Sequence, residues 1–353
     1  MQAADVAAAL RASGGVRVVS GGTKLGWGHP IEAPELSVAE LDAIVEHNEG
    51  DLTAIVQAGV PLAAARETFA RAGQMLALDP PDDGATIGGI VATGDSGPLR
   101  HRYGAPRDLV LGVQVALPDG SLARAGSKVI KNVAGYDLAK LMTGAYGTLG
   151  VVTEVSLRLH PAPRESLTVV VRSDDPRALA VTAGELTHRP LEAERLDLRW
   201  ESGGGAVLVQ LCGPSARERA NSIDGEVVHD DEPVWAAQRA AQRGPVVVRV
   251  STTQQRLADV LAAARDHGAV CVARAAHGLA WLRFESADAE LIGQLRTRLG
   301  ACVLLDAPAE LRRAVDPWGA LTAEPLMRRI KARFDPHDIL NPGLLLLPRP
   351  ART

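Results

Sequence analysis

The sequence predicts an α+β fold in two domains, and three observations support this prediction. With 353 residues, the chain exceeds the size at which a single hydrophobic core usually stops growing. Short β-branched runs alternate with helix-like segments along most of its length. Pro161 and Pro163 interrupt this alternation, because proline neither donates to a strand ladder nor continues a helix. We therefore expect a first domain over 1–162, a second over 163–325, and a C-terminal segment over 326–353 that returns to the first.

The first domain begins with a helix over 4–11 and a short strand over 16–19, which ends at the glycine turn Ser20-Gly21-Gly22-Thr23-Lys24. Residues 61–73 are expected to form a helix whose first turn carries a proline. The tight turn Pro118-Asp119-Gly120 is expected to join two strands into a hairpin. Strands are expected over 44–45, 53–56, 109–117, 122–125 and 150–159.

In the second domain, strand-like and helix-like segments alternate twice. This predicts two similar β-α-β halves that form an antiparallel sheet with helices on one side. The segments lie over 167–171, 177–187, 193–200, 206–211, 246–250, 254–267, 270–274 and 279–284. A last helix over 326–334 is expected to end at Asp335-Pro336, and a turn at Asn341-Pro342-Gly343 precedes an apolar tail.

Composition and charge narrow the classes of function. The formal net charge is −4, with basic and acidic residues intermixed, so we expect no nucleic-acid partner. No apolar run approaches the roughly 20 residues that span a bilayer, and the N-terminus does not resemble a signal peptide, so we expect a cytoplasmic protein without direct membrane insertion. Cys212, Cys271 and Cys302 lie far apart in the sequence and cannot by themselves ligate an iron–sulfur cluster or a structural zinc. We expect buried thiols and no metal.

A first small-residue segment suits a pyrophosphate group. Ser20, Gly21, Gly22, Thr23 and Lys24 follow a strand and offer consecutive backbone N–H groups with little side-chain bulk. They also fit a plain turn, because Gly-Gly turns after strands are common. The segment matches neither G-x-G-x-x-G nor the Walker pattern, so a nicotinamide Rossmann site and a P-loop are disfavoured.

A second small-residue segment covers 79–94 and includes Thr86, Gly88, Gly89, Ala92 and Thr93. Such residues lose backbone entropy on ordering and bury little side chain, so we expect a ligand to approach this backbone closely. A flat ring system and a diphosphate are such ligands. The alternative is a glycine-rich helix start that packs tightly on a sheet.

A third segment carries a family resemblance. It runs from Lys131-Asn132-Val133-Ala134-Gly135-Tyr136-Asp137-Leu138 to Gly147-Thr148-Leu149-Gly150, and a block over 102–112 precedes it. In order and spacing, these blocks and the two earlier segments resemble the FAD-binding domain of the vanillyl-alcohol oxidase/PCMH flavoprotein family over roughly residues 1–160. Within that family, the likeness is strongest to the FAD-binding subunit of bacterial glycolate oxidase. Phe334-Asp335-Pro336 and Leu340-Asn341-Pro342-Gly343 resemble the family's closing signature.

This resemblance implies a PCMH-type FAD-binding domain of two α/β subdomains. FAD would bind without a covalent link, because Thr23 stands where some relatives carry a histidine. By resemblance, residues 20–24 with Thr86, Gly88 and Gly89 would hold the pyrophosphate. The residues near the flavin or adenine would be Ala92, Thr93, Lys131, Asn132, Gly135, Gly150 and Val152. Main-chain groups of small residues match the hydrogen-bonding edges of isoalloxazine.

The second domain departs from the pattern of catalytic hydroxyacid members of this family. Those members carry H-x-G-D-G-N-x-H, which by resemblance binds a divalent metal and the substrate hydroxyl. Here His277 matches the first position, but the acidic, asparagine and second histidine positions are Ala280, Leu282 and Phe284. One histidine cannot build that site, so no catalytic residue is assigned.

Three functions fit these observations. The first is an FAD-binding subunit of a glycolate (2-hydroxyacid) oxidase or dehydrogenase complex. It would relay electrons beside a larger catalytic flavoprotein and an iron–sulfur subunit, in the cytoplasm or held at the inner membrane by these partners. The second is a self-sufficient FAD oxidoreductase for a small hydroxyacid or alcohol, using Arg102, Tyr136, His277 or Arg283. The third is a non-catalytic structural subunit.

Overall fold

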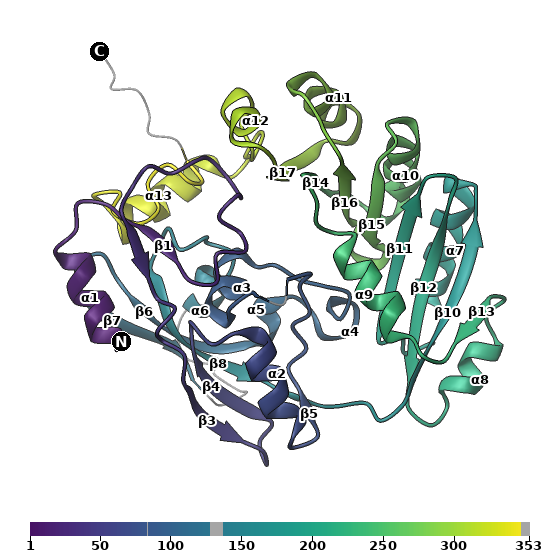
Figure 1. Cartoon of the computed structure of the whole chain (residues 1–353), viewed down its shortest axis with the longest axis horizontal. Helices are drawn as coiled ribbons and strands as arrows, with labels where there is room; N and C mark the ends of the chain where they lie inside the picture. Colours follow the sequence, from purple (N-terminus) through teal and green to yellow (C-terminus); the bar gives the residue numbers. More distant parts are fainter. Residues whose placement is uncertain (83, 128–136, 347–353) are drawn as a thin grey trace.

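The computed structural model describes the chain except for residues 83, 128–136 and 347–353. Figure 1 shows two bodies side by side, one around a five-stranded sheet and the other around an eight-stranded sheet. The chain passes to the second body after Pro161, and helix α13 (Glu324–Phe334) lies on the first body again. The predicted α+β fold with helices and antiparallel sheets is confirmed.

The first body contains a sheet of strand order β3-β4-β8-β6-β7, antiparallel throughout. The strands of the first body, which include the separate pairs β1-β2 and β5-β9, are β1 (Arg17–Val19), β2 (Glu35–Ser37), β3 (Ile44–Asn48), β4 (Thr53–Gln57), β5 (Gln74–Met75), β6 (Val110–Ala116), β7 (Leu122–Gly126), β8 (Val151–Arg158) and β9 (His160–Pro161). Its helices are α1 (Ala3–Arg11), α2 (Leu62–Ala70), α3 (Ile87–Thr93), α4 (Arg100–Tyr103), α5 (Pro106–Leu109) and α6 (Leu138–Met142). The expected hairpin is confirmed as β6 and β7, with Gly120 at a positive φ of 80° in the turn.

Helix α3 lies in the middle of the first body and forms part of its core. Ile87, Ile90 and Val91 are fully buried and pack with residues of β4 and β8 in one hydrophobic cluster. The helix begins after Thr86, whose side chain accepts from Gly89 N, and it ends at Gly94 in the left-handed conformation. The glycine-rich segment therefore forms a capped, buried helix.

The second body is a sheet of order β13-β10-β12-β11-β15-β16-β14-β17 with antiparallel neighbours. Its strands are β10 (Ser166–Ser173), β11 (Arg195–Glu201), β12 (Gly204–Cys212), β13 (Glu226–Val228), β14 (Val246–Ser251), β15 (Val270–Arg274), β16 (Leu279–Phe284) and β17 (Ala301–Asp306). Its helices are α7 (Pro176–His188), α8 (Ala216–Asn221), α9 (Glu232–Ala240), α10 (Leu257–Asp266), α11 (Ala289–Leu299), α12 (Ala309–Ala314), and the short 3-10 helices η1 (Gln254–Arg256) and η2 (Ala275–His277). The two expected halves are present as β10-β12-β11 and β14-β16-β15, which meet where β11 pairs with β15.

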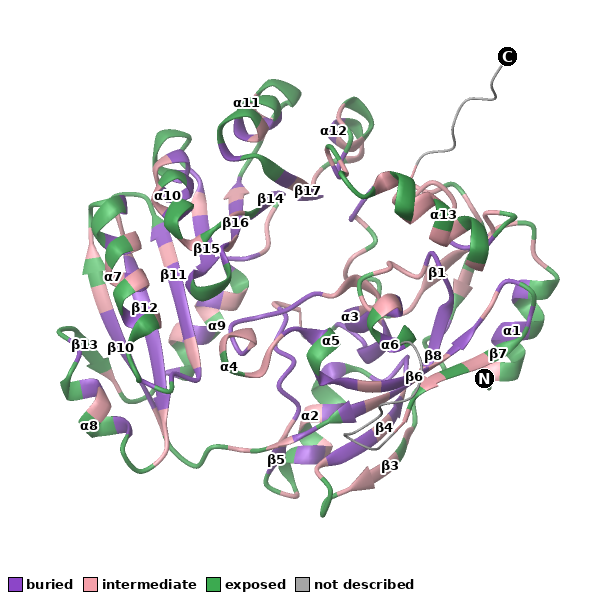
Figure 2. Cartoon of the chain, turned by 180° about the vertical axis from the view of Figure 1, so that it is seen from behind, coloured by how far each residue is buried: buried purple, intermediate pink, exposed green. Residues whose placement is uncertain are grey.

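The two faces of this sheet differ in chemistry because side chains alternate along each strand. Val248 of β14 and Leu282 of β16 belong to a large core that α7, α8, α10 and α11 cover. Figure 2 shows the central strands as buried and the outer sides of these helices as exposed. The alternate positions, such as Arg249 and Arg274, belong to the opposite face. That face therefore carries charged side chains between the two bodies.

The C-terminal segment is hydrogen-bonded to the chain at the start of the first strand. Val16 N donates to Ile339 O at 2.8 Å, and Asn341 N donates to Val16 O at 2.9 Å. The carboxylate of Asp335 is buried and accepts hydrogen bonds from Ile339 N at 2.9 Å and Leu340 N at 2.7 Å. The residues that resembled a closing signature thus hold the segment after α13 in place. Within the described ranges, no helix is both long enough and apolar enough to cross a membrane.

Candidate functional site

A cavity of about 880 Å³, including its open mouth, lies in the first body beside β1 and α3. Its walls come from four stretches of the chain, within 17–38, 58–93, 146–152 and 341–344. The cofactor residues expected from the sequence that line it are Ser20, Gly21, Gly22, Thr23, Lys24, Thr86, Gly88, Gly89, Ala92, Thr93 and Val152. Segments far apart in the sequence therefore converge on one cavity.

The turn after β1 supplies one wall. The Ser20 hydroxyl is buried, lines the cavity, and has no hydrogen-bond partner among the described residues. A Cβ on Gly21 would lie 2.4 Å from Gly84 O, so only glycine lets the turn pass this backbone. Gly22 has a φ of +74°, which also favours glycine. Buried polar groups normally have partners, so the cavity suits a ligand that hydrogen-bonds to Ser20.

Helix α3 supplies a second wall through two adjacent glycines with different roles. A Cβ on Gly88 would lie 2.5 Å from the Cβ of Ala58 and 2.8 Å from its carbonyl oxygen, so Gly88 is required for packing. A Cβ on Gly89 would meet only the Thr86 hydroxyl, at 3.2 Å. Both glycines line the cavity. The packing alternative explains Gly88, whereas Gly89 leaves space that a Cβ would occupy.

Asn341 joins a third wall to the first. Its Oδ1 accepts from Val18 N at 2.8 Å, and its Nδ2 donates to Tyr146 O at 2.8 Å. Tyr146 adopts a positive φ of 55°, and its N–H donates to Ala92 O at 2.7 Å. Neither Asn341 nor Tyr146 was expected at the site from the sequence. The closing signature that contains Asn341 was the available signal.

The Lys24 side chain is buried in an ion pair. Its Nζ lies 3.2 Å from Asp95 Oδ2 and 3.9 Å from Asp82 Oδ2, with 6% of the Lys24 side chain and 2% of the Asp95 side chain exposed. Lys24 also donates to the hydroxyl of Thr23 at 3.1 Å. Asp95 therefore compensates the ammonium charge, and Lys24 links the turn after β1 to the chain after α3.

Arg243, which follows α9 in the second body, holds the same turn from the other side. Its Nη2 donates to Thr23 O at 2.7 Å, and its Nη1 lies 2.9 Å from Asp306 Oδ2. Asp306 also accepts from Trp27 Nε1 at 3.0 Å, and Trp27 lines the cavity. Burial raises the pKa of Asp306, while the Arg243 charge opposes that rise. The second body thus helps to fix one wall of the cavity.

A group of cationic side chains from the second sheet faces the first body. Arg249 lies beside the Tyr146 hydroxyl, where its charge lowers the pKa of Tyr146 against the larger raising effect of burial. The Arg249 Nε is buried without a hydrogen-bond partner in the part of the chain that the structure describes. Burial first, and the Arg100 charge second, lower the pKa of His277 to about 4. His277 is therefore neutral near neutral pH.

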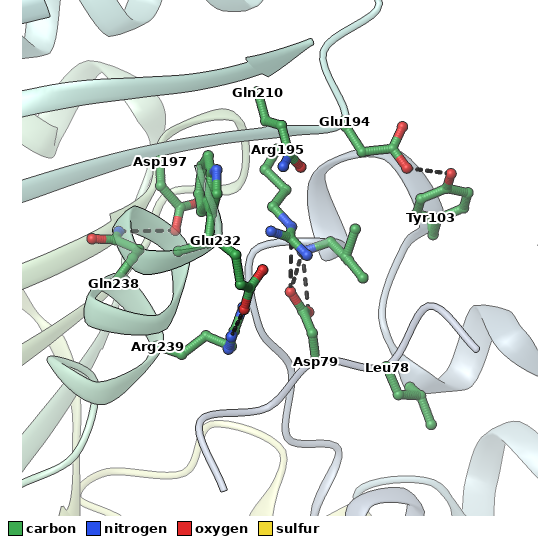
Figure 3. A network of polar contacts seen from close by, with 12 residues as sticks. Leu78, Asp79, Tyr103, Glu194, Arg195, Asp197, Gln210, Glu232, Gln238 and Arg239 are labelled. Carbon is green, nitrogen blue, oxygen red and sulfur yellow. Dashed lines mark hydrogen bonds and ion pairs between the residues drawn. The ribbon is translucent and has the colours of Figure 1, made fainter. Parts of the chain in front are cut away.

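A buried polar network joins the two bodies (Figure 3). Both carboxylate oxygens of Asp79 accept from Leu99 N, at 3.1 and 3.0 Å, and Asp79 Oδ2 lies 3.8 Å from Arg195 Nε. On the same sheet face, Arg274 Nη1 lies 2.7 Å from Asp197 Oδ2, and both side chains are almost fully buried. Asp79 belongs to the first body and Arg195 to the second, so this charge pair helps to fix the relative position of the two bodies, whereas Arg274 and Asp197 pair within the second body.

The remaining residues expected at the site do not line the cavity where the structure describes them. Gly150 does not line it, although Val151 and Val152 do. Lys131, Asn132, Gly135 and Tyr136 lie outside the described residues. None of Arg102, His277 and Arg283 lines the cavity; for example, Arg102 pairs with Glu194 at 3.4 Å.

Two expected features of metal and thiol chemistry can be described. No group of three or more potential ligands (His, Cys, Asp or Glu) that could hold a metal ion occurs within the described ranges. Cys271 and Cys302 are buried, and burial raises the pKa of Cys302 to about 11. Cys212 is partly buried, and burial raises its thiol pKa to about 12. All three thiols are therefore poor nucleophiles near neutral pH.

The cavity residues fit FAD. An unpartnered hydroxyl at Ser20 and free space at Gly89 suit a pyrophosphate, and a wall of small residues suits a flat ring system. Tyr146 lines the cavity, and its ring meets that of Trp318 edge to face, with centroids 4.9 Å apart. When bound there, FAD would supply electron and hydride transfer, which protein side chains alone do not provide.

Comparison with known proteins gives independent support for FAD as the cofactor. The FAD binding domain family matches residues 2–126, and the C-terminal domain family of FAD linked oxidases matches residues 309–345. Glycolate oxidase subunit GlcE of Escherichia coli (strain K12) is 43% identical over 144 residues, which cover 40% of this chain and 41% of that protein. Mitochondrial D-lactate dehydrogenase [cytochrome] of Arabidopsis thaliana is 42% identical over 34% of this chain and 21% of its own length. The chain thus spans less than half of either relative.

More distant proteins match over nearly the whole chain. An uncharacterized FAD-linked oxidoreductase of Mycobacterium tuberculosis (strain ATCC 25618 / H37Rv) is 28% identical over 97% of this chain and 88% of its own length. The solved structure of alkyldihydroxyacetonephosphate synthase superimposes with a TM-score of 0.70 and 14% identity, over 97% of this chain and 74% of that one. This structural likeness shows the fold alone. The chain therefore carries an FAD-binding domain, a short C-terminal stretch of it is similar to the C-terminal domain of FAD linked oxidases, and FAD is its cofactor.

Proposed function

We propose that this chain is the FAD-carrying subunit of a glycolate (2-hydroxyacid) oxidase or dehydrogenase complex. In this proposal it relays electrons beside a larger catalytic flavoprotein and an iron–sulfur subunit, and it does not oxidise the hydroxyacid alone. The matches to glycolate oxidase subunits support the substrate class: GlcE of Escherichia coli at 43% identity, and GlcD of Bacillus subtilis (strain 168) at 36% identity over 41% of this chain.

The observation that carries the proposal is the environment of strand β16. Ala280, Leu282 and Phe284 occupy the positions where the resembled catalytic pattern has its acidic, asparagine and second histidine residues. All three side chains are buried in the hydrophobic core beneath α10 and α11, on the sheet face that points away from the cavity. The cavity thus has walls that fit FAD, whereas these β16 positions contribute apolar core.

The residues of this chain would then have binding and positioning roles. The cradle from Ser20 to Lys24 and the Gly89 backbone hold the pyrophosphate, and the Tyr146 loop with Asn341 closes the cavity. Lys131, Asn132 and Gly135 are assigned to the flavin by resemblance only. Domain limits of 1–162, 163–325 and 326–353 are likewise proposed, and the course of the chain between the two bodies supports them.

Anaerobic reduction of the bound flavin tests this proposal. The purified, FAD-loaded chain is mixed with glycolate, and the absorbance of oxidised flavin is followed with dithionite as a positive control. We expect dithionite, but not glycolate, to bleach the isolated chain. We expect glycolate to bleach its flavin once the larger flavoprotein subunit is present. Bleaching of the isolated chain by glycolate would overturn the relay assignment.

A self-sufficient FAD oxidoreductase for a small hydroxyacid is the second candidate, and Arg249 favours it. This cation has a buried Nε without a hydrogen-bond partner among described residues, and it lies beside Tyr146, which lines the cavity. A guanidinium binds carboxylate well because its fork matches the two oxygens. In this case glycolate or a related hydroxyacid would bleach the isolated chain, and Arg249→Met would abolish that bleaching.

A further inference from the structure

A second hollow, which we call the α13 groove, lies on the outside of the first body. Its volume is about 1060 Å³ including the opening, and it runs between α6, the loop after α6, and α13. The apolar side chains that line it include Leu141, Ala145, Leu149, Met327, Ile330 and Leu344. These side chains make the floor of the groove largely apolar.

The α13 groove shares a wall with the flavin cavity. Asn341 and Leu344 line both hollows. In the loop after α6, Tyr146 and Gly147 line the flavin cavity, while Ala145 lines the groove. Single layers of side chain and backbone therefore separate the groove from the cofactor site. A protein seated in the groove would lie close to bound flavin without entering its cavity.

Helix α13 is an exposed, basic edge of this groove. None of its residues is buried, and the Leu326 side chain is 50% exposed. The helix carries four basic residues and one acidic residue, a net of +3 (four minus one), whereas the whole chain has a net charge of −4. By the helical period, Leu326, Arg329 and Arg333 share the side that is turned away from Met327 and Lys331. The outer side of α13 thus combines an apolar residue with two cations.

The charges of the groove floor are already compensated. Lys331 Nζ contacts Asp335 Oδ2 at 2.5 Å and Asp338 Oδ1 at 3.0 Å, and it also donates to Thr148 O at 3.0 Å. Arg329 and Arg333 have no hydrogen bond or ion pair with any described residue, and both are exposed. The uncompensated charge of this surface is therefore positive and lies on the outer side of α13. An occupant with acidic side chains would complement it.

We propose that the α13 groove and the outer side of α13 are the docking site of a one-electron redox protein with an acidic, partly apolar surface. This inference rests on the relay function proposed above. Each docking event transfers one electron between the flavin and the iron–sulfur cluster of the partner. Two such events oxidise the two-electron-reduced flavin, two clusters are reduced, and the flavin protons pass to water.

Binding of a plant-type [2Fe–2S] ferredoxin tests the docking site, because such ferredoxins are small, acidic one-electron proteins. Its dissociation constant for the FAD-loaded chain is measured by isothermal titration at low and at 0.5 M salt, beside basic cytochrome c as a probe of opposite charge. We expect ferredoxin to bind at low salt, high salt to weaken it, and cytochrome c not to compete. Arg329→Glu/Arg333→Glu should weaken ferredoxin binding by about tenfold or more, and Leu326→Ser should weaken it less.

Arg177→Glu/Arg217→Glu is the matched control, because both arginines are exposed on α7 and α8, far from α13 (Figure 1). This variant changes the net charge equally, and we expect ferredoxin binding to stay near that of the unmodified chain. Equal weakening by both double variants, or no binding of ferredoxin at low salt, would overturn the docking site. Binding through α13 without transfer from reduced ferredoxin to the flavin would instead count against the relay function and leave the docking site standing.

Discussion

Gly88→Ala and Gly89→Ala are neighbouring substitutions in α3 with opposite expected effects on the protein without FAD. A Cβ at Gly88 would lie 2.5 Å from the Cβ of Ala58 and 2.8 Å from its carbonyl oxygen. Carbon atoms prefer separations of about 3.5 to 4.0 Å, so either α3 or the chain at Ala58, just after β4, must shift. A Cβ at Gly89 meets one atom, the Thr86 hydroxyl, at 3.2 Å and otherwise enters the cavity.

The magnitudes follow from these distances. Overpacking at Gly88 should lower the free energy of unfolding by about 1–3 kcal/mol, because the atoms that must move belong to a buried strand end. At Gly89, alanine should raise the stability of the FAD-free protein by up to about 1 kcal/mol, since alanine is the better helix former. Its methyl group would occupy space that the pyrophosphate needs. We expect the affinity for FAD to fall about tenfold, equivalent to about 1.4 kcal/mol.

Urea unfolding of the FAD-free protein and fluorescence titration with FAD measure the two effects separately. Gly293→Ala is a matched control, because Gly293 lies inside α11 and a Cβ there would meet nothing within 4 Å. This control should gain stability like Gly89→Ala and keep its affinity for FAD. The assignment of Gly89 would be refuted if Gly89→Ala bound FAD as tightly as the control, or if it lost as much stability as Gly88→Ala.

Three further changes probe other parts of the site. Asn341→Ala removes the hydrogen bonds that join β1 to the Tyr146 loop, so we expect stability to fall by about 1–3 kcal/mol and FAD to bind more weakly; unchanged FAD affinity would contradict its role in the wall. Lys24→Met leaves the carboxylate of Asp95 buried and unpaired, and should cost about 3–5 kcal/mol in urea unfolding, with partial recovery when Asp95→Asn is added. Burial raises the pKa of Asp197 from 3.8 to about 6 against the opposing charge of Arg274. The folded protein therefore holds a proton that the unfolded chain releases, so stability falls as pH rises from about 4 to about 6, by at most about 3 kcal/mol from this group. Asp197→Asn should flatten this slope, and an unchanged slope would show that Asp197 does not titrate in this window.

Local sequence chemistry predicted one side of the cavity well. The turn from Ser20 to Lys24 follows a strand, and its glycines are required by a close backbone approach at Gly21 and a positive φ at Gly22. The segment containing Thr86 and Gly89 also lines the cavity as expected. These features depend on residues next to each other in the chain, so a pattern of small residues suffices to indicate them.

The other side of the cavity depends on contacts that no local pattern records. Arg243 follows an ordinary amphipathic helix, and Arg249 sits in a β-branched strand; each reaches the site only because the second body lies against the first. Helix α3 was expected only as the alternative for its segment, because two glycines disfavour a helix; burial of Ile87 and Ile90 and the Thr86 cap stabilise it. Strand β17 pairs with β14, more than 50 residues earlier, and its short apolar run gave no periodic signal.

The origin of the cavity walls also determines how FAD binding and stability are coupled. The turn after β1 is held by Arg243 from the second body, and β1 is tied through Asn341 to the segment after α13. A ligand that needs all these walls binds only when the second body and the C-terminal segment are both in place. By linkage, FAD must then stabilise both contacts, by about 2.7 kcal/mol at a free concentration of 100 times its dissociation constant. The same reciprocity means that a partner seated in the α13 groove, against Leu344, can change the affinity for FAD without touching it.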